Sequence, residues 1–83
     1  GIPAAMKKAI AAIEAGSSVA GALVTLESDL LASGFLSIDY AELRDADNLI
    51  PLDSHSPRPM RLLVAARIGK ARLIDNMAVT PAV

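Results

Sequence analysis

The sequence contains no cysteine and a single histidine, His55. The first absence excludes a disulfide scaffold and a thiolate zinc site, and one histidine cannot form a multi-histidine metal site. Aromatic residues make up 2% of the chain, and the formal net charge is -1. A nucleic-acid-binding protein is expected to have a basic excess and stacking aromatic side chains, so this class is not indicated. No apolar run reaches the roughly 20 residues that cross a membrane.

The chain has 83 residues, enough for one small domain, and 53% of them are hydrophobic. Most of these are alanine or aliphatic residues, and the two aromatic residues are Phe35 and Tyr40. A disordered segment combines low hydrophobicity with high net charge, so this composition predicts a folded aliphatic core. The sequence begins with Gly1 rather than methionine. We therefore expect residues 1–83 to be one domain of a longer protein.

The first half of the sequence has the apolar spacing of two amphipathic helices, over residues 4–15 and 18–33. Apolar residues recur every three or four positions, namely Met6, Ile10 and Ile13 in the first helix and Val19, Leu23, Leu26 and Leu30 in the second. Gly16 is expected to end the first helix and Gly34 the second, which Ser17 or Ser18 would cap. Such a short connection predicts an antiparallel helical hairpin.

The second half alternates apolar and polar residues, which is typical of half-buried strands. We predict strands over residues 36–44, 60–68 and 71–79, with a loop over 45–59 that allows a short helical turn near 45–50. Alternation in the first strand places Ile38 and Tyr40 on one face and Asp39 and Ala41 on the other. The predicted fold class is α+β, with two layers: the helical hairpin packs on a small three-stranded antiparallel sheet.

The Gly-Lys pair at 69–70 fits a two-residue hairpin turn, which fixes the register of the last two strands. Arg67 then lies opposite Arg72, and Asp75 lies opposite Val64 on the apolar face. The two arginines need an anion or a carboxylate between them, and a buried carboxylate needs a partner. We expect something outside the hairpin to complete it, whether a loop of this domain, a neighbouring domain or a ligand.

No catalytic or nucleotide-binding motif is found in the sequence. The Gly-Lys turn lacks the glycine-rich loop of a phosphate site. His55 lies in a proline- and serine-rich stretch and is expected to be a solvated loop residue. Asp45, Asp47 and Asn48 lack the spacing of a calcium loop, so we expect a turn in which such side chains bond to local backbone. We therefore predict no catalytic, cofactor-binding or metal-binding residue.

Two blocks of the second half resemble the C-terminal end of the pantothenate synthetase (pantoate–β-alanine ligase) family. Residues 38–49 read I-D-Y-A-E-L-R-D-A-D-N-L, and residues 62–76 read L-L-V-A-A-R-I-G-K-A-R-L-I-D-N. The family has an I-D-Y-x-E strand followed by L-L-V-A-A-R-x-G-x-T-R-L-I-D-N near its terminus, in the same order. The sequence departs from the family at Ala71, where threonine is usual, and this loses one hydroxyl contact.

The resemblance implies an ATP-dependent ligase of bacterial coenzyme A biosynthesis, a cytoplasmic homodimer that uses ATP and Mg²⁺. In this family pantoate is adenylated with release of pyrophosphate, and the amine of β-alanine then displaces AMP. The catalytic residues belong to an N-terminal nucleotidyltransferase domain, and none maps onto this sequence. The resemblance therefore implies that residues 1–83 are a C-terminal lid domain, inactive alone and without a bound cofactor, whose partner is the missing N-terminal domain.

Four candidate site residues remain, namely Arg67, Arg72, Asp75 and Asn76. We favour a structural network within the domain, in which Arg72 or another cation pairs with Asp75 and Asn76 caps a strand or loop. The alternative is a contact with the nucleotide-binding domain that tunes closure. For the whole chain, the alternative function is a stand-alone interaction or dimerisation module, and independent binding of ATP or pantoate is a further hypothesis.

Overall fold

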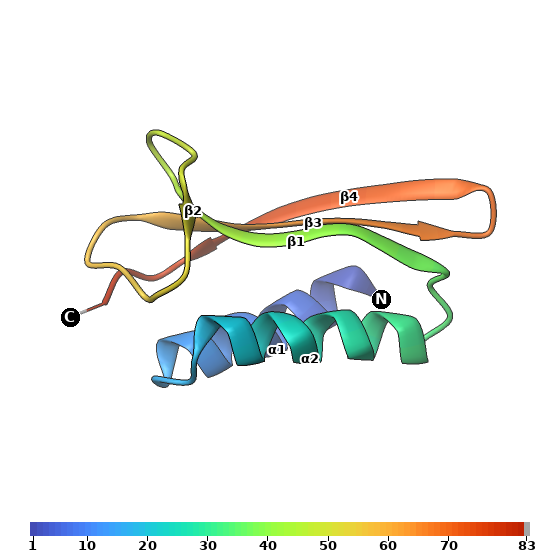
Figure 1. The fold of residues 1–83 in the computed structure, drawn as a ribbon, viewed down its shortest axis with the longest axis horizontal. Helices are drawn as coiled ribbons and strands as arrows, with labels where there is room; N and C mark the ends of the chain where they lie inside the picture. The colour runs from blue at the N-terminus through green and yellow to red at the C-terminus, as the bar shows by residue number, and fades with distance from the viewer. Residues whose placement is uncertain (83) are drawn as a thin grey trace.

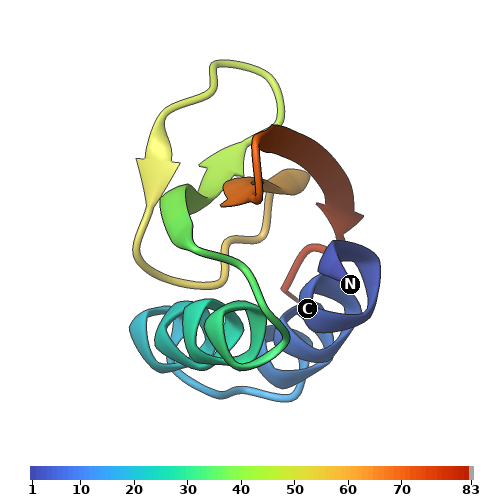
Figure 2. The ribbon, with the colours of Figure 1, turned by 90° about the vertical axis from the view of Figure 1, so that its right-hand side faces the viewer.

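The structure, a computed structural model, describes residues 1–82 as two helices and four strands in two layers (Figure 1). The helices are α1 (Ile2–Glu14) and α2 (Val19–Ala32), and the strands are β1 (Ser37–Asp45), β2 (Pro51–Leu52), β3 (Met60–Ile68) and β4 (Ala71–Val79). The strands form one antiparallel sheet in the order β2-β1-β3-β4, and both helices lie beneath it (Figure 2). The predicted α+β class and the two layers are confirmed.

The prediction of three strands is wrong by one, because the loop after β1 contributes β2. Its two residues pair with the end of β1, Leu52 opposite Leu43 and Pro51 opposite Arg44. Two residues are too few to show alternation in a sequence, and a leading proline restricts the strand to the edge of a sheet. The remaining predicted boundaries agree with the structure to within two residues.

The helical hairpin forms for the local reasons that the sequence indicates. Gly16 has a φ of 99°, a conformation that glycine adopts readily, and it follows the end of α1. The Ser18 hydroxyl accepts the backbone N–H of Gly21 at 3.0 Å and so caps α2. Neither helix within residues 1–82 is long and apolar enough to span a membrane.

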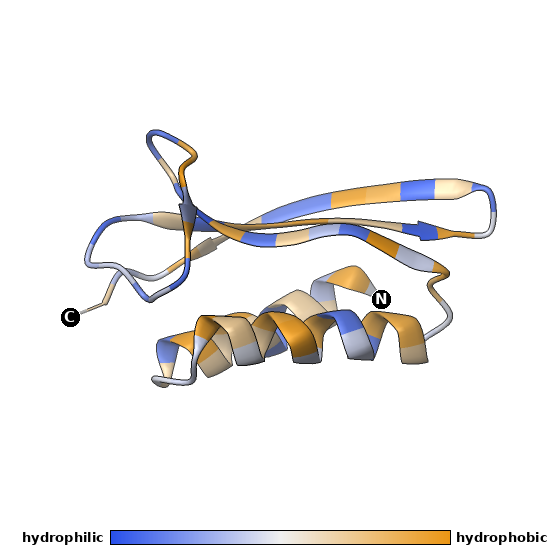
Figure 3. Ribbon diagram, in the orientation of Figure 1, coloured by the Kyte–Doolittle hydropathy of each residue, from blue (hydrophilic) through white to orange (hydrophobic). Residues whose placement is uncertain are grey.

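The core lies between the helices and the inner face of the sheet, which we define as the face toward the helices. The central strand β3 contributes Met60, Leu62, Val64 and Ala66, none more than 1% exposed. The helices contribute large buried side chains, namely Met6, Ile13, Leu26 and Leu30. Apolar and polar residues alternate along the strands in Figure 3, as a sheet with one covered face requires.

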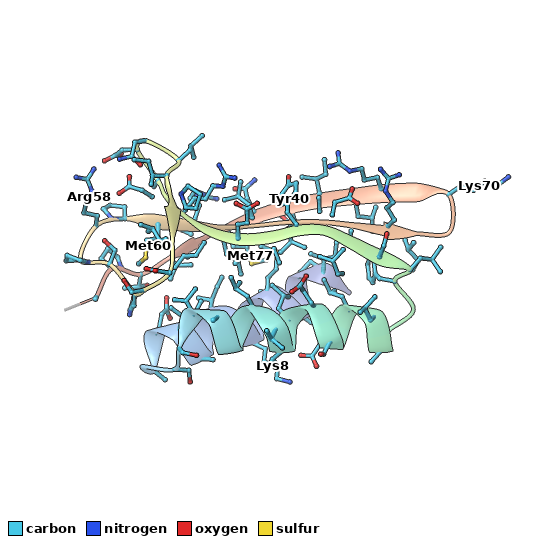
Figure 4. All side chains as sticks on the ribbon, viewed as in Figure 1. Lys8, Tyr40, Arg58, Met60, Lys70 and Met77 are labelled. Atoms are coloured by element: carbon cyan, nitrogen blue, oxygen red, sulfur yellow. The ribbon has the colours of Figure 1, made fainter. Side chains whose placement is uncertain are left out.

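A β-bulge in β1 corrects the predicted facing of its side chains. The register with β3 shifts between Ile38 and Tyr40, so Asp39 is an extra residue in the pairing. Ile38 and Ala41 both pack against the core, whereas Tyr40 lies on the opposite, outer face (Figure 4). The prediction that Ile38 shares a face with Tyr40, and Asp39 with Ala41, is therefore wrong. An inserted residue interrupts the two-residue period, and alternation alone does not reveal it.

The β3–β4 hairpin has the predicted turn and register. Gly69 has a φ of 56°, and Ile68 pairs with Ala71 across the turn. Consequently Arg67 lies opposite Arg72, as expected, and the same register extends through all nine residues of each strand. The turn chemistry therefore determined which side chains meet on each face.

We expect Leu26→Ala to lower the free energy of unfolding by about 2–5 kcal/mol, because it leaves a cavity in the core. The Leu26 side chain is 1% exposed, whereas Val24 in the same helix is 62% exposed. The control substitution Val24→Ala should therefore change stability by about 0.5 kcal/mol or less. Urea unfolding followed by circular dichroism measures both, and equal losses would contradict the assigned core.

Candidate functional site

Arg67 and Arg72 lie side by side on the outer face of the sheet, and both bind Asp39. Arg72 Nε donates to Asp39 Oδ2 at 2.6 Å, and Arg67 Nε donates to Oδ1 at 3.3 Å. These contacts join β1, β3 and β4 through one carboxylate, which we call the Asp39 clamp. The carboxylate required between the two arginines is thus supplied by this chain, and the bulge in β1 places it there.

Asp75 does not take the partner that we predicted for it. Arg72 is engaged by Asp39, so the expected pair between Arg72 and Asp75 is wrong. Asp75 is half-buried opposite Val64, and its Oδ1 accepts the backbone N–H of Asn76 at 2.8 Å. It forms no ion pair within residues 1–82. A half-buried position lets solvent reach the carboxylate, which reduces the cost of leaving it without a cation.

Other arginines of the outer face are also held by neighbouring side chains. The Asn76 side-chain oxygen accepts Arg61 Nη2 at 2.6 Å. Glu42 Oε2 accepts both Arg44 Nη2, at 2.6 Å, and Arg44 Nε, at 3.1 Å. Arg61 Nε is the buried side-chain polar atom without a partner in the described part of the chain. Sequence reasoning found Asn76 but missed Arg61, because nothing local connects residues 15 positions apart.

The turn that follows β1 is organised by the buried carboxylate of Asp45, which is 4% exposed. Its Oδ1 accepts the backbone N–H groups of Asp47 at 2.9 Å and Asn48 at 3.2 Å, so the predicted turn is confirmed. Arg58 Nε, from the far end of the loop, donates to Oδ2 at 2.9 Å. This ion pair closes the loop and was not predicted, because proline-rich loop sequence does not show which residues approach each other.

Hydrogen bonds hold the pKa of both Asp39 and Asp45 below the ordinary value of 3.8. The side chain of Arg72 is the main cause of the lowered pKa at Asp39, and Arg67 adds to it. At Asp45 the main cause is the backbone N–H of Asp47, helped by Asn48 and Arg58. Desolvation opposes these effects at both sites but does not outweigh them. Both carboxylates are therefore stabilised in their charged forms.

His55 is not the solvated loop residue that the sequence predicted. It is half-buried, and its Nε2 lies 2.6 Å from the carbonyl oxygen of Thr80. The Thr80 N–H donates to Glu14 Oε2 at 2.9 Å, and the Ala82 N–H donates to the Ser56 carbonyl at 2.7 Å. The tail of the chain is thus tied to α1 and to the loop. A pocket of about 320 Å³ is lined there by Glu14, His55, Thr80, Pro81 and Ala82.

The residues described do not fit Mg²⁺ or the triphosphate of ATP. Within residues 1–82 no group of three histidine or acidic side chains lies close enough to hold a metal ion. The carboxylates of Asp39 and Asp45 already accept arginine or backbone donors. Arginines that could bind phosphate, such as Arg67 and Arg72, are turned to an internal carboxylate. We assign no step of a nucleotide reaction to these side chains.

Comparison with solved structures identifies this fold as one part of a ligase. Two crystal structures of the Thermus thermophilus enzyme, described as pantothenate synthetase or pantoate–β-alanine ligase, are similar to it. One has a TM-score of 0.79 and 33% identity, over 96% of this chain and 29% of that chain. The other has a TM-score of 0.76 and 34% identity, over 94% of this chain and 28% of that chain.

Sequence comparison narrows the class to one family. The family model described as Pantoate-beta-alanine ligase matches residues 2–78, and the chain belongs to this family. The pantothenate synthetase of Novosphingobium aromaticivorans is 59% identical over 98% of this chain, and that of Rhizorhabdus wittichii is 48% identical over 98%. The chain spans 28% of the length of each of these relatives and corresponds to their C-terminal part.

Acidification is expected to unfold the chain partly through Asp39 and Asp45. Because both folded pKa values lie below 3.8, their contribution to stability is present above pH 3.8 and is lost as the pH falls through the lowered values. Asp39→Asn and Asp45→Asn should each flatten the fall in stability between about pH 5 and about pH 2. Thermal unfolding at several pH values measures this.

Asp53→Asn is the control for removing a charge, since it deletes an exposed carboxylate of the same loop. Retention of the full wild-type pH dependence in both Asp39→Asn and Asp45→Asn would contradict the assigned role of these hydrogen bonds.

Proposed function

We propose that this chain is the C-terminal domain of a longer pantoate–β-alanine ligase, where it covers a reaction centre carried by the preceding part of the enzyme. Its family membership and its match to the C-terminal 28% of the relatives support this proposal. The observation that carries the covering role is the internal pairing of its charged groups, the Asp39 clamp above all. Side chains that are already satisfied can shape and close a site without reacting in it.

The proposed reaction of the complete enzyme proceeds in two steps. A pantoate carboxylate oxygen attacks the α-phosphorus of ATP, so that pyrophosphate leaves and pantoyl adenylate forms. The amine of β-alanine then attacks the acyl carbon, AMP leaves and an amide bond is made. ATP and Mg²⁺ belong to the complete enzyme in this proposal, which also places it in the cytoplasm as a homodimer. None of these ligands is assigned to the present chain.

A cover is useful in this chemistry because water competes with the amine. An acyl adenylate that meets water is hydrolysed, and ATP is then spent without product. Closing a lid over the intermediate excludes water and leaves the bound amine as the nucleophile. A self-contained unit suits this task, because its own core keeps it folded as it moves. Sixteen buried residues, from Ile2 to Val79, form one contiguous core here.

We expect the isolated 83-residue chain to consume no ATP, with or without pantoate and β-alanine, in an assay of AMP release. A chimaera that carries this chain in place of the matched C-terminal part of the Novosphingobium aromaticivorans enzyme should form pantothenate. It should release close to one AMP for each pantothenate, because the cover protects the intermediate.

The native Novosphingobium enzyme is the control for the chimaera. ATP turnover by the isolated chain would overturn the non-catalytic assignment. A folded chimaera that forms no pantothenate would contradict the ligase role, and one that releases excess AMP would contradict the covering role. If sedimentation shows that the isolated chain is a stable dimer and the chimaera is inactive, the chain is instead an interaction module.

A further inference from the structure

Three large apolar side chains are exposed together at the free end of the β3–β4 hairpin. Leu36 is 68% exposed, Leu73 43% and Ile68 37%. Leu73 pairs with the buried residue Ala66, and Ile68 lies two positions beyond Ala66 on the same inner face. The Leu36 N–H donates to the Arg67 carbonyl at 2.7 Å, which places Leu36 beside Ile68. We call Leu36, Ile68 and Leu73 the tip patch.

The helices do not cover the tip patch. In Figure 1 the hairpin turn extends beyond the ends of both helices, so the inner face of the sheet loses its second layer there. Nearer the middle of the sheet the same face is sealed, because Val64 and Ala66 are fully buried. The apolar face therefore continues past its own cover, which is typical of a surface that another part of a protein occupies.

We propose that the tip patch is the docking surface for the part of the enzyme that precedes residue 1. This inference rests on the proposed function, and it identifies the surface through which the cover meets the rest of the ligase. In the relatives, the remainder of the chain precedes the segment that matches this one. The N-terminus lies below the sheet, toward the end of the molecule that carries the hairpin turn, and the C-terminus lies at the other end (Figure 1).

The attachment point explains why a small patch is sufficient. Three side chains expose far less area than a stable interface between separate proteins requires. A preceding domain joined at Gly1 is held nearby at high effective concentration, so weak contacts can hold it in place. A second copy of the chain would have no such advantage. The same weakness suits a cover that must open to admit substrates and release products.

Other surfaces of the chain have less need of a partner. The arginines of the outer face are bound by Asp39, Glu42 and Asn76, and an antiparallel sheet tolerates one solvated face. The groove of about 320 Å³ between the helices is lined mainly by small residues and is closed at one side by a Lys8–Asp29 ion pair at 3.0 Å. The tip patch alone combines clustered apolar exposure with nearness to the N-terminus.

The Asp39 clamp keeps the tip patch in shape from the opposite face. Arg67 immediately precedes Ile68, and Arg72 immediately precedes Leu73. The clamp therefore fixes the backbone on both sides of the turn and limits twisting of the hairpin. A patch held in one conformation loses less entropy on docking than a flexible one.

Two neighbouring isoleucines give a matched pair of reporters for the test. Ile68 lies in the tip patch, whereas Ile74 lies on the outer face and is 60% exposed. Their δ1 methyl groups would be labelled in this chain alone and in the chimaera, by segmental ligation, and exposed to a neutral nitroxide in solution. We expect relaxation of the Ile68 methyl by the nitroxide to fall several-fold in the chimaera, while that of Ile74 is unchanged.

Every other pattern overturns the proposal. Shielding of Ile74 without Ile68 would assign docking to the outer face, and exposure of both would show that neither face docks. Shielding of Ile68 that rises with concentration in the isolated chain would assign the patch to a second copy. A chimaera that forms pantothenate while Ile68 stays exposed refutes the docking surface but not the ligase role. A chimaera without ligase activity refutes the proposed function instead.

Charged substitutions provide a second measurement. The double variant Ile68→Asp with Leu73→Asp should raise the AMP released per pantothenate several-fold in the chimaera, because the cover no longer seats. The controls Ile74→Asp and Val24→Asp place the same charge on exposed positions elsewhere and should leave this ratio unchanged. Unfolding of the isolated variants measures any loss of stability. An equal effect from Ile74→Asp would contradict the proposal.

Discussion

Burial of one face of the central strand is the constraint on which the rest of this structure depends. β3 pairs along its whole length with β1 on one side and β4 on the other, and its inner side chains are closed off by the helices. Four of these, from Met60 to Ala66, are at most 1% exposed. A one-residue slip would move all of them to the outer face, so the register of the whole sheet is determined by this strand.

Local signals predicted most of the fold because they act over only a few residues. Gly16 and Ser18 mark the hairpin of helices, and the Gly-Lys turn at 69–70 sets the last two strands in register. β2 and the bulge at Asp39 were not predicted, since both depend on how distant segments align. A two-residue strand and one inserted residue leave almost no trace in a pattern whose period is two.

The same distinction applies to the charged groups. The turn around Asp45 was predictable because its acceptor and donors are two and three residues apart. The register showed that Arg67 and Arg72 meet and need a carboxylate, yet it did not show which one. Asp39 lies 28 and 33 residues away from them, on a strand whose facing the bulge changes. Sequence therefore predicted the electrostatic requirement, and the tertiary structure supplied the residue that meets it.

The unpaired Asp75 has a consequence for how copies of this chain behave toward each other. β4 is the outermost strand, and its free side offers unused backbone donors and acceptors to any other extended chain. Proteins discourage such strand addition by placing a charge on the inward side of an outermost strand. Asp75 occupies that position, between the inward-facing Leu73 and Met77. A carboxylate that contributes little to the fold thus protects the sheet from growing by stepwise addition of further molecules.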